Sequence, residues 1–275
     1  MTNQPPEPIG ARPSPIATAA AERDARALRR LRAGLDAGSA FLAFQPVVDA
    51  AAPSRVLFHE GLFRISDEMG HEVPAADFMP AAEARDIGRE VDRAALALAI
   101  RELVDYPELH LSINLSARSV GDPEWIRLLG SAVSRVPGLG RRLLIELTER
   151  SSPVLPSLVL DVMAEMRAVG VRIALDDFGT GHSSLAHLQD YRFDILKIDG
   201  RFIRDIERNA DDRALLESML ALARHFGMLA IVERVEAAGQ ADSIRALGAD
   251  GMQGYLFGRP TANPAWRKEP ARRAI

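Results

Sequence analysis

The chain of 275 residues contains no cysteine, few aromatic residues and no excess of positive charge. Without cysteine, the protein can form no disulfide bond, thiolate metal site or cysteine nucleophile. This lack of cysteine is typical of the reducing cytoplasm, and we predict a cytoplasmic location. Aromatic residues make up 5% of the chain, which argues against a base-stacking surface for single-stranded nucleic acid.

Charge and hydropathy exclude two further classes of partner. A formal net charge of −4 provides no basic field, so we expect no nucleic-acid polymer as a partner. No apolar run is long enough to span a bilayer, and the N-terminus lacks the charged-then-apolar pattern of a signal peptide. Hydrophobic residues amount to 47%, which is enough for the core of one large domain or two small ones.

The two ends of the chain differ in composition from its middle. Residues 1–17 are rich in proline and alanine and predict a disordered tail, and the basic residues 267–275 predict a frayed C-terminus. The segment Thr18 to Ala37 carries leucines at helical spacing, which predicts an amphipathic helix with Thr18 as its N-cap. We therefore expect one domain over residues 18–266, with this helix leading into it.

Short β-rich segments recur along this domain, and helical patterns separate most of them. The predicted strands are Phe41–Val48, Arg55–Phe63, Leu109–Leu115, Arg142–Thr148, Val171–Asp176, Asp194–Ile198, Met228–Val232 and Gly251–Phe257. The predicted helices are Pro80–Val104, Pro123–Val136, Leu155–Val169, Ser183–Asp190, Asp211–Phe226 and Ala237–Leu247. Gly170, Gly227 and Gly248 follow three of these helices, where a left-handed C-cap is favoured.

This alternation predicts an α/β fold, a modified TIM (β/α)8-type barrel with an antiparallel first strand. Strands that alternate with helices are parallel, and eight of them suggest a closed barrel. The connection from Asp49 to Ser54 is too short for a parallel crossover, so the first two strands should form an antiparallel hairpin. A doubly wound open sheet is the alternative, but the chain lacks the Gly-rich first turn of that fold.

Acidic residues recur at the ends of the predicted strands, where barrel enzymes place their active sites. They are Glu60, Glu146, Asp176, Asp177 and Glu233, with Asn114, Lys197 and Gln253 at other strand ends. Each could be a structural residue on its own, and Lys197 could simply pair with a carboxylate. Together the acids would be costly to bury without cations, and one lysine cannot neutralise five of them. Oxygen ligands without cysteine suit Mg²⁺ or Mn²⁺, and paired acids can serve two ions in phosphodiester hydrolysis.

The chain resembles the EAL-domain cyclic-di-GMP phosphodiesterases. The segments FQPVVD (44–49), HEGLFR (59–64), FMPAAE (78–83), SINLSAR (112–118), IELTER (145–150), ALDDFGTGHSSL (174–185), LKID (196–199), VERVE (232–236) and GMQGYLFGRP (251–260) match the motifs of that family in order. The resemblance covers residues from about Leu28 to Pro260. It implies a barrel whose first strand is antiparallel, and hydrolysis of cyclic-di-GMP to linear pGpG by a metal-activated water.

The resemblance also implies roles for individual residues. Two ions are expected, one held by Glu60, Asn114, Glu146 and Asp176, and the other by Asp176, Asp177 and Glu233. Lys197 would contact the nucleophilic water, Gln253 would support the water or metal shell, and Glu149 would brace the loop 177–184. That loop would also form a homodimer interface. Contacts with cyclic-di-GMP are expected from Gln45, Arg64, Asn114, Asp199 and Glu236.

Two departures from the family pattern leave alternatives open. The signature Glu-Ala-Leu is Glu60-Gly61-Leu62, which removes a methyl group but no chemistry. The usual Glu-Gly-Val-Glu is Glu233-Arg234-Val235-Glu236. Arg234 could bind a substrate phosphate, point away, obstruct the site or compete with metal. Besides an active phosphodiesterase, the chain could thus be a catalytically degenerate domain that acts as a cyclic-di-GMP receptor or protein-interaction module. A different metal-dependent barrel hydrolase is a third alternative.

Overall fold

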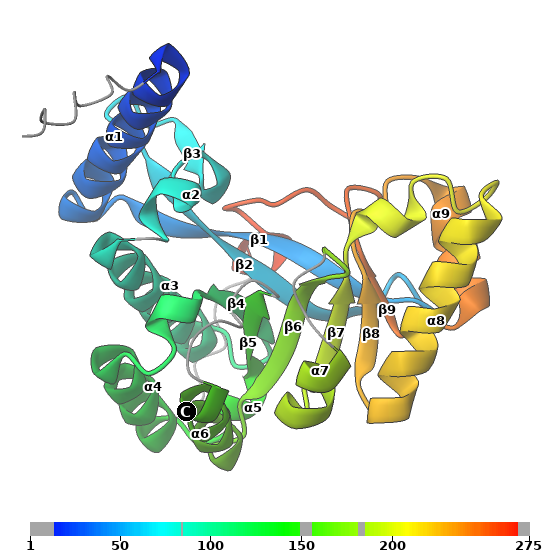
Figure 1. The fold of residues 1–275 in the computed structure, drawn as a ribbon. Helices are drawn as coiled ribbons and strands as arrows, with labels where there is room; N and C mark the ends of the chain where they lie inside the picture. The colour runs from blue at the N-terminus through cyan, green and yellow to red at the C-terminus, as the bar shows by residue number, and fades with distance from the viewer. Residues whose placement is uncertain (1–13, 84, 149–155, 181–184, 269–275) are drawn as a thin grey trace, which may run out of the picture.

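The alternation of strand and helix folds into a closed barrel. The computed structural model describes residues 14–83, 85–148, 156–180 and 185–268. Nine strands of this part form one sheet in the order β1-β9-β8-β7-β6-β5-β4-β2-β3, and β1 also pairs with β2. Eight strands therefore close into a barrel, and β3 extends β2 outside it (Figure 1). The predicted modified (β/α)8-type barrel is confirmed.

Most strands have nearly the predicted bounds, but the last one ends at Gln253, four residues before its predicted end at Phe257. They are β1 (Ala40–Asp49), β2 (Val56–Ser66), β3 (Glu72–Pro74), β4 (Leu111–Leu115), β5 (Leu143–Thr148), β6 (Arg172–Phe178), β7 (Ile195–Ile198), β8 (Leu229–Val232) and β9 (Gly251–Gln253). The α-helices are α1 (Pro15–Asp36), α2 (Met79–Ala82), α3 (Asp86–Asp105), α4 (Pro123–Arg135), α5 (Leu139–Arg142), α6 (Pro156–Ala168), α7 (Leu185–Tyr191), α8 (Ala210–Phe226) and α9 (Ala238–Leu247). Figure 1 shows the helices arrayed along the outside of the strands, with α1 projecting at one end.

Strand β1 runs antiparallel to both of its neighbours, β2 and β9, as the short connection after it predicts. Because no crossover helix joins β1 to β2, the outer face of β1 needs another cover. The C-terminal segment supplies it: the Trp266 ring packs edge-on against Phe44, with ring centroids 5.0 Å apart, and also meets Tyr106. Arg267 pairs with Glu102 on α3 and so fixes this segment to the barrel.

Side chains that point into the barrel form two layers. The lower layer is apolar and consists of Val47, Phe58, Leu144, Ala174, Ile195 and Ile231. Successive side chains in a strand alternate between faces, so residues two positions further toward the barrel mouth also point inward. Those positions hold Gln45, Glu60, Glu146, Asp176, Lys197 and Glu233. The alternation of the strands therefore builds a polar layer directly above an apolar floor.

Three details of the predicted elements are corrected by the structure. Helix α1 begins at Pro15, and Ser14 caps it by accepting a hydrogen bond from the Ala17 amide. Thr18 is therefore not the N-cap, and the helix includes residues expected in the tail. The single helix predicted over Pro80–Val104 is divided into α2 and α3. A Cβ on Gly88 would lie 2.8 Å from the Ala82 carbonyl oxygen, which shows how tightly the corner between them is packed.

The glycines predicted to follow three helices in a left-handed conformation are confirmed. Gly227 and Gly248 adopt positive φ values of 71° and 81° at the C-caps of α8 and α9, and Gly170 has a φ of 88° after α6. Strand β3 was not predicted, because three residues that include a proline give no alternating pattern. Among the described residues, no helix combines the length and the apolar character needed to cross a bilayer.

Candidate active site

The polar layer at the carboxyl ends of the strands is centred on Lys197. This side chain is fully buried, and its Nζ lies 2.6 Å from Glu146 Oε2, 2.7 Å from Glu233 Oε1, 3.1 Å from Asp176 Oδ1 and 3.3 Å from Glu60 Oε2. These carboxylates come from β5, β6 and β2 and from the end of β8. The structure therefore brings together four of the five acids predicted for the site around one ammonium group.

The position of each acid follows from strand register. Asn114 on β4 pairs with Glu146 on β5, which pairs with Ala174 on β6. The small Ala174 leaves room beside Glu146, and Asp176 follows two residues later on the same face. Glu146 and Asp176 are therefore offset by two residues in the register, and the tilt of the strands in the closed barrel brings their side chains to the same height.

Hydrogen bonds orient Glu60 within this layer. Its Oε1 accepts from Asn114 Nδ2 at 3.1 Å, and its Oε2 accepts from Gln253 Nε2 at 2.6 Å. Gln253 Nε2 also donates to Gln45 Oε1 at 3.1 Å, and Gln45 Nε2 donates to the Gly258 carbonyl. Gln45 therefore holds Gln253 and acts on the site through it.

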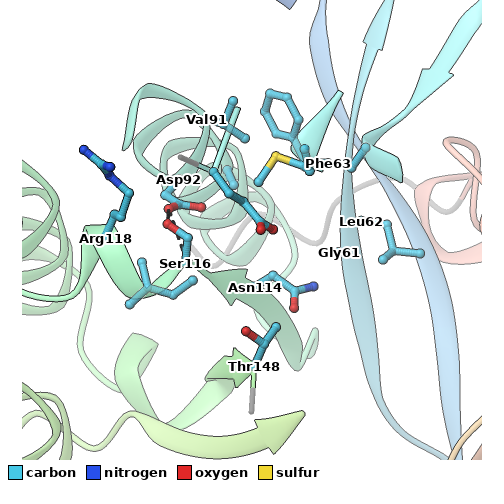
Figure 2. Close-up of a pocket in the computed structure, with 14 residues that line it drawn as sticks. Gly61, Leu62, Phe63, Val91, Asp92, Asn114, Ser116, Arg118 and Thr148 are labelled. Carbon is cyan, nitrogen blue, oxygen red and sulfur yellow. Dashed lines mark hydrogen bonds between the residues drawn. The ribbon is translucent and has the colours of Figure 1, made fainter. Parts of the chain in front are cut away.

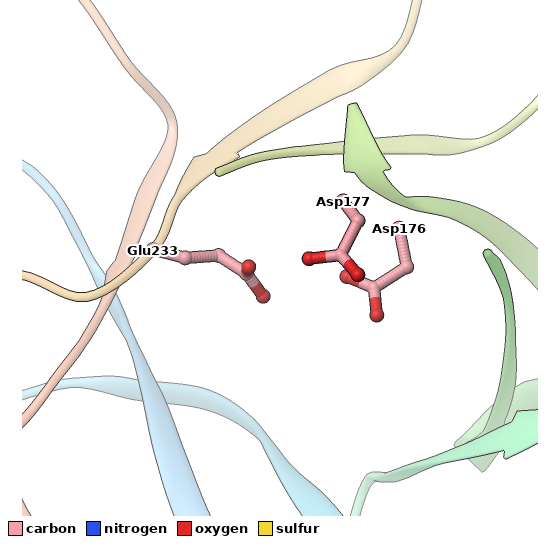
Figure 3. A group of neighbouring side chains, drawn as sticks. All are labelled: Asp176, Asp177 and Glu233. Carbon is pink, nitrogen blue, oxygen red and sulfur yellow. The ribbon is translucent and has the colours of Figure 1, made fainter. Parts of the chain in front are cut away.

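Asp177 completes a group of acids that could hold a metal ion. Ligand oxygens of Asp176, Asp177 and Glu233 all lie within 4.8 Å of one another. Figure 3 shows the Asp176 and Asp177 carboxylates side by side, with Glu233 reaching toward them from the end of β8. Asp177 has a φ of 56°, a left-handed conformation that turns its side chain to the same side as Asp176. The adjacent acids thus act as a pair.

The four carboxylates around Lys197 carry more negative charge than its single ammonium group can neutralise. Burial raises the pKa of Glu233 to about 8, because the carboxylates of Asp176 and Glu60 add to it and Lys197 offsets only part of the effect. Burial and the neighbouring Glu60 likewise raise the pKa of Glu146 well above its ordinary value. Burial also acts on Glu60, but Lys197 and the hydrogen bonds from Gln253 and Asn114 outweigh it and lower its pKa. Lys197 keeps its proton, because the four carboxylates outweigh burial and raise its pKa well above normal.

These residues fit a divalent cation. Their donors are carboxylate and amide oxygens, which hard ions such as Mg²⁺ and Mn²⁺ prefer. Among the described residues, Glu146 Oε1 and Gln253 Oε1 are buried without a hydrogen-bond partner, so these two oxygens of the polar layer lack a partner that a cation could supply. The raised pKa values of Glu146 and Glu233 also result from uncompensated negative charge. In the absence of a cation, these carboxylates bind protons more readily, whereas a bound cation would stabilise their charged form.

A pocket of about 400 Å³ opens beside the polar layer, between β2, β4 and α3. Its walls include Phe63, Met79, Val91 and Leu115, and Asn114 lies at its edge (Figure 2). Asp92 on α3 also lines it and accepts a hydrogen bond from Ser116 Oγ at 2.5 Å. Burial raises the pKa of Asp92 to about 6, although hydrogen bonds from Ser116 and Ser119 act in the opposite direction.

Asp92 was not among the site residues predicted from the sequence. The buried residues of α3 recur at helical spacing through Gly88, Val91, Ala95, Leu96 and Ala99. Asp92 falls within this buried stripe, and a carboxylate among apolar residues is the signal that could have identified it.

Several other predicted site residues lie elsewhere. Arg64 is buried, and its Nε donates to Glu72 Oε1 on β3 at 2.9 Å. Asp199 is buried without contacting Lys197, because its carboxylate pairs with Arg201 and Arg234. Glu236 is exposed beyond β8. Contacts of these residues with a ligand stay predictions. Glu149 and its predicted bracing role lie outside the described residues.

Arg234, the main departure from the expected pattern, follows Glu233 in the loop after β8. Its backbone has a φ of 56°, a conformation that favours glycine. Its guanidinium turns to Asp199, with Nη2 3.1 Å from Oδ2, rather than to the acids around Lys197. Arg234 therefore does not fill the site.

Comparison with known proteins identifies the family of the chain. The model of the EAL domain family matches residues 28–260, which is most of the chain. The chain belongs to the EAL domain family. It is 30% identical over 237 residues to the cyclic di-GMP phosphodiesterase PdeF of Escherichia coli, a match that covers 85% of this chain and 31% of PdeF. The chain thus spans about a third of the length of this relative.

Solved structures of EAL domains share the fold. The PaMucR phosphodiesterase in complex with c-di-GMP superposes with a TM-score of 0.78 at 29% identity, over 89% of this chain and 100% of that structure. The FimX EAL domain from Pseudomonas aeruginosa bound to c-di-GMP also has a TM-score of 0.78, at 26% identity over 86% and 97% of the two chains. Both are EAL domains that bind the same cyclic dinucleotide.

Proposed function

We propose that the chain hydrolyses cyclic-di-GMP to linear pGpG at the mouth of the barrel, with two divalent cations, Mg²⁺ or Mn²⁺. The observation that carries the proposal is the convergence of the predicted ligands in one polar layer above an apolar floor. Glu60, Asn114, Glu146 and Asp176 would hold one ion. Asp176, Asp177 and Glu233 would hold the other. Such ions, when bound, supply the charge that activates water and stabilises phosphoryl oxygens.

The protein's own residues then have distinct tasks. Lys197 holds the carboxylates together and offsets part of their repulsion, and its ammonium could orient the attacking water. Gln253 and Asn114 fix the rotamer of Glu60 by donating to its two oxygens. The adjacent pocket offers apolar walls and a carboxylate at Asp92, a combination suited to a guanine base. The base would thereby anchor the dinucleotide with its phosphate near the acids.

Chromatographic detection of pGpG tests the proposal. Protein stripped of metal by a chelator and then supplied with Mn²⁺ should convert cyclic-di-GMP to pGpG, and omission of Mn²⁺ should prevent it. Glu60→Gln should abolish turnover with an unchanged circular dichroism spectrum. Glu90→Gln is the matched control, because Glu90 pairs with Arg32 on α1 away from the site. Binding of cyclic-di-GMP without turnover would instead assign the chain as a receptor.

We propose two further properties that follow from this function. The chain would form a homodimer through the loop 177–184, of which residues 181–184 lie outside the described part. Sedimentation at increasing concentration tests this, and a monomer at all concentrations would contradict it. Its place of action would be the cytoplasm, which fractionation of cells that produce the full protein tests.

A further inference from the structure

Arg234 occupies a position that the backbone makes unfavourable for it. The residue directly follows Glu233, and its φ of 56° is costly for any side chain with a Cβ. The neighbouring turn makes space for it: a Cβ on Gly200 would lie 2.4 Å from the Arg234 Cβ and 2.9 Å from the Glu233 carbonyl oxygen. The loop that carries Glu233 therefore packs closely against the Gly200 turn.

The guanidinium of Arg234 carries positive charge to the rim of the acidic group. Its Nη2 lies 3.1 Å from Asp199 Oδ2. The same carboxylate also accepts hydrogen bonds from the backbone amide and Nε of Arg201. One carboxylate thus pairs with two guanidinium groups and can neutralise only one of them, so a net positive charge remains beside Asp199. Arg234 directly follows the proposed ligand Glu233 in the chain. Asp199, which holds the guanidinium of Arg234, follows Lys197 by two residues at the end of β7. The charge of Arg234 therefore lies beside the acidic group.

We propose that Arg234 weakens the binding of a divalent cation to the group Asp176, Asp177 and Glu233. This inference rests on the two-ion site of the proposed function. A fixed positive charge beside a cation site repels the incoming ion, so its dissociation constant rises. The side chain is 62% exposed, so water and salt screen the repulsion, and we expect an effect on the order of tenfold. Arg234 thereby sets the metal concentration at which the site fills.

Titration of chelator-stripped protein with Mn²⁺ tests this without any turnover. The free ion is followed by electron paramagnetic resonance, which gives the number of bound ions and their dissociation constants. Arg234→Gln removes the charge and retains much of the side chain's length, and should bind the weaker ion about tenfold more tightly than the wild type. Arg234→Lys keeps the charge and should stay within about twofold of the wild type. At high salt the difference in Mn²⁺ dissociation constant between the wild type and Arg234→Gln should become smaller, because ions screen the charge of Arg234.

The controls separate this inference from the proposed function. Asp176→Asn should lose the binding of Mn²⁺, because Asp176 would bridge the two ions. If Asp176→Asn binds Mn²⁺ as well as the wild type, the metal site is wrong, and both proposals fail. If Asp176→Asn loses binding but Arg234→Gln binds no more tightly than the wild type, only the role of Arg234 is overturned. Tighter binding by Arg234→Lys equal to that of Arg234→Gln would also overturn it, because the charge would not be the cause.

Discussion

Lys197→Met removes the one cation at the centre of four carboxylates, and we expect it to destabilise the metal-free protein strongly. Nζ lies 2.6–3.3 Å from these carboxylates, and the side chain is 1% exposed. Removing one partner of a buried ion pair costs about 3–5 kcal/mol, because the remaining charge loses its compensation. The loss has an upper limit, since the carboxylates can take up protons. We therefore expect the free energy of unfolding to fall by about 3–5 kcal/mol at pH 7.5.

Urea denaturation in the presence of a chelator measures this loss. Leu196→Met is the matched control, because Leu196 is buried on the opposite face of the same strand. A swap between apolar side chains of similar volume costs less than about 1.5 kcal/mol. The difference in unfolding free energy between the two variants should become smaller at lower pH, where the carboxylates bind protons. It should also become smaller on addition of Mn²⁺, which supplies positive charge. Equal stability of the two variants at pH 7.5 would refute the reasoning.

Three further predictions concern other parts of the structure. The pKa of Asp92 is about 6 against an ordinary 3.8, so its contribution to stability is present at low pH and falls by about 3 kcal/mol as the pH rises through 6. Asp92→Asn should flatten the dependence of unfolding free energy on pH between 4 and 7, and an unchanged slope would contradict the assignment. Trp266→Ala should cost about 2 kcal/mol in denaturant unfolding, since the half-buried ring covers Phe44; no loss would mean that the C-terminal segment does not seal β1. Gly200→Ala should destabilise by about 1–3 kcal/mol, and the loss should be smaller in an Arg234→Gly background, because the Arg234 Cβ is the nearest obstacle.

The alternation within each strand carried most of the information about fold and site. In β2, β5 and β7, an apolar inward residue is followed two positions later by Glu60, Glu146 or Lys197. Period two alone places these side chains on one face, and the closed barrel then brings the faces together. The antiparallel β1 was predictable as well, because a connection of about six residues permits only a hairpin.

Details that depend on distant parts of the chain were not predictable. The sequence left open which carboxylate Lys197 contacts. The answer, four at once, depends on the radius of the closed barrel. Asp92 lies far from the acids in sequence and meets Ser116 only through the packing of α3 on β4. The break between α2 and α3 depends on the close approach of Gly88 to the Ala82 carbonyl.

Arg234 shows a different limit to what can be predicted from the sequence. Glycine at this position would have indicated a positive φ, whereas arginine conceals it. Its pairing with Asp199 follows from that backbone conformation and from the space left by Gly200. The direction of the side chain therefore could not be read from residue type or from strand alternation.

Hydrolysis of cyclic-di-GMP in water enriched in ¹⁸O tests the central claim most directly. With Mn²⁺ present, mass spectrometry of the product should show pGpG with one ¹⁸O in its terminal phosphate, because a water oxygen attacks the phosphorus and the 3′ oxygen leaves. The same reaction with Asp176→Asn should give no product. Recovery of intact cyclic-di-GMP from the wild-type protein under these conditions would contradict the account.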